Sequence, residues 1–131
     1  VKASARLDQL IASAQSELSE FSELNFIVFH DAYQYFERRF GLSASGAISL
    51  GDAEDPSPAR IREIQAKVTE LGITCAFTEP QYNPGLIKAV FGSTKTIKMG
   101  VIDPLGASIP EGAGHYEKLI LQMVDSIKSC K

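Results

Sequence analysis

Four side chains that could bind a metal or exchange a proton each follow a short apolar run of the sequence. They are His30 and the carboxylates Asp31, Glu79 and Asp103. If those runs are parallel strands, their carboxyl ends meet at one edge of a sheet, which is where open α/β sheets bind ligands. The spacing therefore predicts an imidazole and up to three carboxylates at the same edge.

A neutral imidazole is a good ligand for a metal such as zinc, and carboxylates can complete the shell. Each of these residues also has a structural interpretation. For His30, a hydrogen bond to a loop carbonyl is favoured on the residue pattern alone. Asp103 is equally suited to be a ligand or to order the turn that follows it. Asp31 is better explained as a helix cap, and Glu79 as a side chain that holds its loop through backbone hydrogen bonds.

The familiar motifs of enzymes do not occur in this sequence. The segment 41–45 lacks the final glycine of a nucleophile elbow, and no G-x-G-x-x-G follows the first apolar run. The segment 92–96 has the residue types of a phosphate loop but not its spacing, so it is predicted to be a turn. His115, at the start of the last expected helix, is expected to be solvated. Together these observations disfavour an enzyme.

Apolar periodicity alternates between the helical and the strand type along the chain. Strands are expected over 24–29, 46–50, 73–78 and 96–102, and helices over 6–21, 32–40, 58–71, 84–91 and 115–130. Tyr35, Phe36 and Phe40 are expected on the buried face of the second helix and Leu71 on the core face of the third, and Tyr116 is one of the apolar residues at helical spacing in the fifth. This alternation predicts an α/β fold, in which helices cover both faces of a four-stranded parallel sheet.

Two of the helix starts are strongly marked. Ser57 and Asn83 are each followed directly by proline, which is the pattern of a cap residue with proline at the first helical position. Gly72 is expected to end the first of these two helices.

The chain has 131 residues and a formal charge of −3, which suits one domain. A net acidic chain is disfavoured as a partner of nucleic acid or of an anionic membrane. The sequence begins at Val1 without methionine, and the helical pattern over 6–21 is strong from its first turn. We therefore expect a piece of a longer protein, and a free N-terminal helix that packs on its own domain is an equal alternative.

The sequence contains two cysteines, Cys75 and Cys130, and no C-x-x-C motif. A disulfide between them would close a loop of about 55 residues, for which chain entropy predicts about 4 kcal/mol of stabilisation. It would also hold the last helix in place. Two separate buried thiols are the alternative. The disulfide is favoured, and it implies an oxidising compartment.

Several motifs resemble the periplasmic zinc-binding proteins of bacterial high-affinity zinc ABC transporters, the ZnuA family. The motifs occur in the family's order at 29–33, 35–37, 40–42, 75–82 and 99–106, with Cys130 at the end of the last helix. The resemblance spans nearly the whole chain and is far more specific than any one short motif in it.

The resemblance implies a fold of two α/β lobes joined by one long helix, with the metal in the cleft between them. Residues 1–22 correspond to the end of that connecting helix and residues 23–131 to the C-terminal lobe. The implied function is high-affinity zinc uptake by the periplasmic substrate-binding component of an ABC transporter. The implied partners are zinc as cargo, the first lobe of the same protein and a membrane permease. No catalysis is implied.

The resemblance also assigns site residues. It makes His30 a zinc ligand, places Asp103 where related members supply a carboxylate ligand, and supports the pairing of Cys75 with Cys130. The family's other two histidine ligands lie in its first lobe and are not in this sequence. Zinc takes four ligands in a tetrahedral shell, so His30 and Asp103 provide at most half a site, and we expect weak binding.

Three alternatives stay open at this point. A carrier of manganese or another divalent metal is the first, although manganese-type relatives tend to have glutamate where His30 stands, and histidine suits zinc better. A small enzyme that uses His30 with Asp103 as an acid–base pair is the second. A flavodoxin-like interaction domain without metal is the third.

Overall fold

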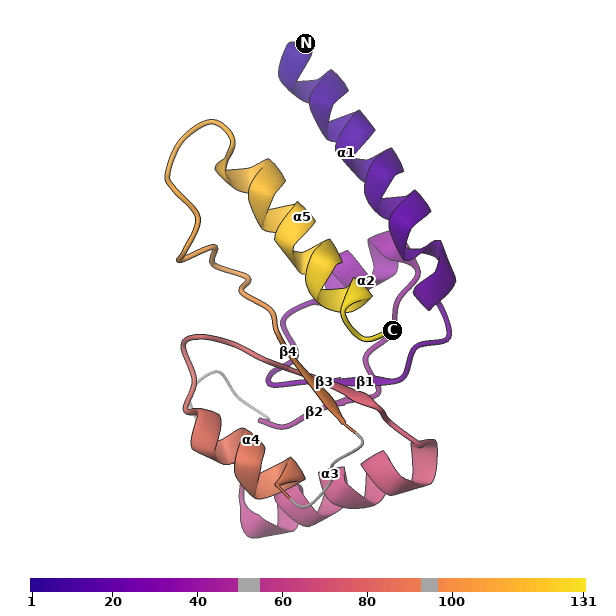
Figure 1. Ribbon diagram of the computed structural model, residues 1–131, viewed down its shortest axis with the longest axis vertical. Helices are drawn as coiled ribbons and strands as arrows, with labels where there is room; N and C mark the ends of the chain where they lie inside the picture. The colour runs from indigo at the N-terminus through magenta and orange to yellow at the C-terminus, as the bar shows by residue number, and fades with distance from the viewer. Residues whose placement is uncertain (50–54, 93–96) are drawn as a thin grey trace.

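The sheet of the computed structural model, which describes residues 1–49, 55–92 and 97–131, has four parallel strands (Figure 1). Their order is β2-β1-β3-β4, and they are β1 (Phe26–Val28), β2 (Gly46–Ala47), β3 (Cys75–Thr78) and β4 (Lys98–Val101). The predicted four-stranded parallel sheet is therefore confirmed, with shorter strands than expected. Parts of the expected strands 46–50 and 96–102, and most of the segment 92–96, lie outside the described residues.

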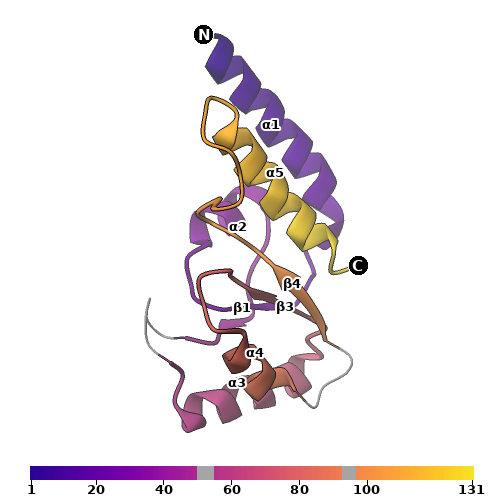
Figure 2. The same ribbon diagram turned by 60° about the vertical axis from the view of Figure 1, so that its left-hand side comes forward.

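Helices cover both faces of this sheet, as Figures 1 and 2 show. They are α1 (Lys2–Leu18), extended by the 3-10 turn η1 (Ser19–Phe21), α2 (Gln34–Phe40), α3 (Pro58–Leu71), α4 (Pro84–Phe91) and α5 (His115–Lys128). One face packs on α1, α2 and α5, and the other on α3 and α4.

The alternation of side chains along β1 serves both layers, because successive residues of a strand point to opposite faces. Phe26 and Val28 belong to the core beneath α1 and α5. Ile27 and Phe29 belong to the core beneath α3 and α4. The almost wholly apolar run is thus explained by burial on both sides.

The marked helix starts are confirmed. The Oγ of Ser57 accepts a hydrogen bond from the backbone N–H of Arg60 at 3.2 Å, and the Oδ1 of Asn83 accepts one from that of Gly85 at 2.8 Å. Each cap satisfies a backbone donor that has no partner within its helix. Gly72 ends α3 in the left-handed conformation, with φ of 61°, which glycine adopts without steric cost.

The second helix differs from its prediction. It begins at Gln34 and has no side-chain cap; the carboxylate of Asp31 instead accepts a hydrogen bond from the Gln34 side chain at 3.0 Å. No residue of α2 is fully buried, and Tyr35 is 89% exposed. Phe36 and Phe40 are half-buried and pack edge to face against each other.

The reason is that these side chains face a surface groove of about 440 Å³. The groove lies between α1, α2 and α5 and is lined by Leu7, Leu10, Ile11, Tyr35, Phe36, Arg39, Phe40, Tyr116 and Ile120. Leu71 on α3, which was expected in the core, is exposed, and so is Tyr116 on α5. Periodicity identifies the apolar side of a helix but not whether another element covers it.

The first helix is attached to the last one along its length. Ala14 and Leu18 are buried in the core that α1 shares with α5. Ion pairs join Glu17 to Lys128 at 2.6 Å and Glu20 to Lys131. Such exposed ion pairs contribute little free energy, so apolar burial is the main attachment of α1 to this layer.

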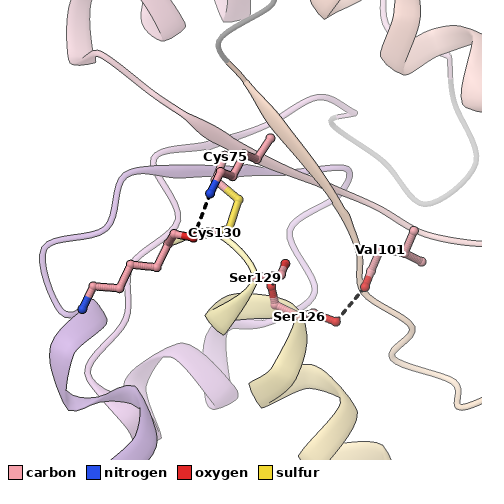
Figure 3. Close-up of a disulfide and its surroundings, with 7 residues drawn as sticks. Cys75, Val101, Ser126, Ser129 and Cys130 are labelled. Atoms are coloured by element: carbon pink, nitrogen blue, oxygen red, sulfur yellow. Dashed lines mark hydrogen bonds between the residues drawn. A yellow bond between two sulfur atoms is a disulfide. The ribbon is translucent and has the colours of Figure 1, made fainter.

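The predicted disulfide between Cys75 and Cys130 is confirmed (Figure 3). It joins the buried start of β3 to the second residue after the end of α5, with 5.7 Å between the two Cα atoms. Nearby, the Ser126 hydroxyl donates a hydrogen bond to the carbonyl of Val101 at 2.7 Å. The end of α5 is therefore tied to both β3 and β4.

We expect the double variant Cys75→Ala with Cys130→Ala to lose about 4 kcal/mol of unfolding free energy, because its unfolded chain is no longer restricted by a loop of about 55 residues. Denaturant unfolding with and without a reducing agent measures this. The reductant should destabilise the original chain by a similar amount and leave the double variant unchanged. An equal midpoint for the original chain under both conditions would contradict a stabilising disulfide.

Candidate metal site

The carboxyl edge of the sheet brings His30 and Glu79 into direct contact. The Nδ1 atom of His30 lies 2.5 Å from the Oε2 atom of Glu79. The pairing of β1 with β3 explains this contact, since Phe26 pairs with Cys75. His30 is four residues after Phe26, and Glu79 is four residues after Cys75. The His30 side chain is 14% exposed and that of Glu79 is 2% exposed, so only the histidine reaches the surface.

Aromatic rings surround the pair. The Tyr82 ring stacks on Phe29 at 4.1 Å between centroids and lies 5.4 Å from the His30 ring. Tyr33 is buried, and its ring centroid lies 6.2 Å from that of the imidazole. Its hydroxyl is close enough to Glu79 to interact with it, but has no hydrogen bond of ordinary geometry within the described part of the chain. These rings pack beside a carboxylate that is almost wholly removed from water.

This environment shifts two pKa values. Burial raises the pKa of Glu79, and the adjacent His30 opposes that shift. Burial, followed by the charge of Glu79, raises the pKa of Tyr33 well above its usual value. A carboxylate removed from water is unfavourable unless a partner compensates it, and His30 is that partner here.

Asp103 is buried and directed at its own loop. Its Oδ1 accepts hydrogen bonds from the Gln81 side chain at 3.1 Å and from the backbone of Leu105 at 3.0 Å. Its Oδ2 accepts one from the backbone of Ala107 at 2.8 Å. Burial alone would raise the pKa of Asp103, but these hydrogen bonds outweigh it and the pKa is lowered. The turn-ordering role is thus present in the structure, while metal ligation by Asp103 stays a prediction.

The described residues contain no group of three or more histidine, cysteine, aspartate or glutamate side chains that could hold a metal ion. The edge nonetheless gathers acidic groups beside His30, since the charge of Asp103 also raises the pKa of Glu79. His30 and Glu79 are thus in contact, and Asp103 is near enough to affect Glu79 electrostatically, but the three do not form a tetrahedral metal shell.

The contact of Glu79 with His30 was not predicted from the sequence. It was predicted to hold its loop through backbone hydrogen bonds, but its carboxylate contacts His30 instead. The available signal was its position directly after an apolar run, which is also the position of His30.

The prediction of a solvated His115 is also wrong in part. The His115 ring is half-buried, and its Nδ1 lies 3.3 Å from the carbonyl oxygen of Pro110. It packs on Gly106, where a Cβ atom would approach the Nε2 of His115 to 2.7 Å. Gly106 also has a φ of 65°, so both the backbone conformation and the close contact require glycine. His115 thus packs against the loop 103–114.

A family model described as ZnuA, zinc-uptake complex component A, periplasmic, matches residues 1–130. The chain belongs to the ZnuA family. The high-affinity zinc uptake system protein ZnuA of Brucella abortus (strain 2308) is 46% identical over 125 residues, which are 95% of this chain and 37% of the relative. That of Paracoccus denitrificans (strain Pd 1222) is 38% identical over 129 residues, 98% of this chain and 40% of the relative. The chain therefore spans about two fifths of the length of these ZnuA relatives.

Solved structures show the same architecture. The laminin-binding protein Lmb of Streptococcus agalactiae, described as having adhesin and metal-transporting activity, matches with a TM-score of 0.77 and 26% identity. The match covers 97% of this chain and 48% of Lmb. A crystal structure of ZnuA matches with a TM-score of 0.72 at 21% identity, over 94% of this chain and 46% of that one, and supports the fold. Among the described residues, no helix is long and apolar enough to cross a membrane.

Replacement of Asp103 by asparagine should lower the free energy of unfolding by about 1–3 kcal/mol at neutral pH, because an amide nitrogen would then face the backbone donors of the loop. The pKa of Asp103 is lower in the folded state than in the unfolded chain. Its stabilising contribution is therefore complete above the usual aspartate pKa of about 4 and is lost as the pH falls through the folded value.

Unfolding free energies of the original chain and of Asp103→Asn should thus converge as the solution is acidified below about pH 4. Asp8→Asn, on the exposed side of α1, serves as the matched control and should follow the original chain at every pH. A stability difference for Asp103→Asn that is the same in acid and at neutral pH would contradict this account.

Proposed function

We propose that the chain is the C-terminal lobe of a periplasmic zinc-binding protein that captures zinc and passes it to the permease of an ABC transporter. It catalyses no reaction. The observation that carries the proposal is the imidazole of His30, placed at the carboxyl edge of the sheet and contacted by the buried Glu79, in a chain of the ZnuA family. Zinc is the cargo here and not a resident cofactor.

The incomplete site supports a second source of ligands. His30 provides one nitrogen ligand, and Asp103 is the proposed carboxylate, whose oxygens already accept hydrogen bonds from Gln81 and its own loop. Because zinc takes four ligands, we assign the remaining ones to the first lobe of the same protein. The share of the relatives that this chain spans supports such a further lobe.

The same proposal interprets residues 1–22 as the end of a helix that connects the two lobes and residues 23–131 as the lobe itself. Apolar contacts of α1 with α5 hold this segment against the lobe. The apolar groove between α1, α2 and α5 is left uncovered by the described residues, in agreement with a chain that packs against more protein than is present here.

One feature supports zinc as the metal, and another supports the periplasm as the compartment. A histidine nitrogen suits zinc better than manganese, which prefers oxygen ligands. The disulfide between Cys75 and Cys130 fits the oxidising periplasm. A related carrier of manganese is the alternative, and metal titration distinguishes the two.

In calorimetric titrations at neutral pH, we expect the chain to bind zinc with a Kd of about 1 µM or weaker, since at most two of the four ligands are present. His30→Ala should abolish this binding. His115→Ala is the matched control, because it removes the other histidine of the sequence, and it should bind zinc like the original chain.

Manganese should bind more weakly than zinc in the same titration. Zinc binding that survives in His30→Ala would overturn the proposed site. Tighter binding of manganese than of zinc would favour the manganese carrier.

A further inference from the structure

The contact between His30 and Glu79 determines which nitrogen of the imidazole is free. A carboxylate accepts hydrogen bonds and cannot donate them, so the Nδ1 of His30, 2.5 Å from the Oε2 of Glu79, holds the hydrogen. In a neutral imidazole, the other nitrogen then carries a free lone pair. This nitrogen, Nε2, has no hydrogen-bond partner among the residues that the structure describes.

We propose that Glu79 is a positioning residue for zinc capture: it fixes His30 in the tautomer with hydrogen on Nδ1 and orients Nε2 toward the metal. This inference rests on the proposed function, in which His30 is a zinc ligand. Glu79 itself need not touch the metal, and its effect is exerted through His30.

The surroundings of Glu79 make it suitable for this role. Glu79 as a whole is 3% exposed. Its backbone carbonyl accepts a hydrogen bond from the backbone N–H of Tyr82 at 3.2 Å, which closes the turn after β3. His30 and Glu79 follow the adjacent, paired strands β1 and β3. Two groups at the ends of paired strands are held at a more constant separation than two groups on independent loops.

The rings of Tyr33 and Tyr82 lie near the imidazole, with centroids 6.2 Å and 5.4 Å from its own. A histidine ligand that donates its second N–H to a carboxylate has a fixed ring orientation and a more basic lone pair. Loss of such a partner lowers metal affinity by about 10–100-fold. A purely structural role for Glu79, in which it only holds the turn after β3, would affect stability without changing the His30 tautomer.

Three variants separate these roles. Glu79→Met removes the acceptor while keeping a side chain of similar length, and Glu79→Gln keeps an oxygen that can still accept from Nδ1. Glu37→Met is the matched control, since the Glu37 carboxylate, on α2, accepts a hydrogen bond from the backbone of Ala44 at 2.5 Å, whereas the partner of His30 Nδ1 is Glu79.

The His30 tautomer is measured by proton–nitrogen correlation NMR of the metal-free chain at about pH 8, where an ordinary histidine is neutral. We expect hydrogen on Nδ1 in the original chain, in Glu79→Gln and in Glu37→Met. In Glu79→Met we expect a shift toward hydrogen on Nε2. Zinc titration should show a loss of affinity of about 10–100-fold in Glu79→Met, a smaller loss in Glu79→Gln and none in Glu37→Met.

The original chain by itself can overturn the inference, whether or not Glu79→Met folds. Hydrogen on Nε2 of His30 in the metal-free state, or zinc bound through Nδ1, would exclude the positioning role. So would a folded Glu79→Met variant with an unchanged tautomer and unchanged zinc affinity. If any of these results is found and His30→Ala still loses zinc binding, the positioning role of Glu79 fails but the proposed function stands. If His30→Ala keeps zinc binding, the proposed function fails as well.

Discussion

Parallel pairing between β1 and β3 is the constraint on which the other features of this chain depend. The register that pairs Phe26 with Cys75 aligns the ends of the two strands, so that His30 meets Glu79. The same pairing places Phe26 and Phe77 edge to face in the core beneath α1 and α5. A shift of one residue would turn every side chain of the strand to the opposite face and would remove both the core and the contact at the edge.

Two buried carboxylates at this edge are stabilised in different ways. Asp103 accepts hydrogen bonds from its own loop and from Gln81, and its pKa is lowered. Glu79 relies on His30 as its main partner, and burial keeps its pKa raised. Asp103 is thus bound to the local backbone, whereas Glu79 depends on a residue from another strand. This difference makes Glu79 the carboxylate that is coupled to the proposed metal ligand.

The helical layer formed by α1, α2 and α5 has an apolar surface that remains open. Apolar side chains of all three helices line one groove, and no described element covers it. The disulfide and the apolar contacts of α1 with α5 hold the layer together without that cover. The proposed assignment of this chain as one lobe of a larger ZnuA-family protein would account for the uncovered groove.

Local patterns in the sequence determined much of this protein. Buried strands, proline-marked helix starts at Ser57 and Asn83, and the alternation of elements depend on neighbouring residues, so they could be predicted. The motifs were specific enough to indicate the family, and the cysteine pair indicated the disulfide. The strand ends also indicated that His30, Glu79 and Asp103 share one edge.

Only the tertiary structure decided what those groups contact. The sequence did not show that Glu79 reaches His30 or that Asp103 accepts hydrogen bonds from Gln81, because these contacts depend on strand order, register and loop path between residues far apart in the chain. It also did not show that Tyr35 is exposed, since periodicity marks an apolar side but burial requires a partner in space. Asp31 does not cap its helix for a similar reason: the chain turns into α2 three residues later, at Gln34.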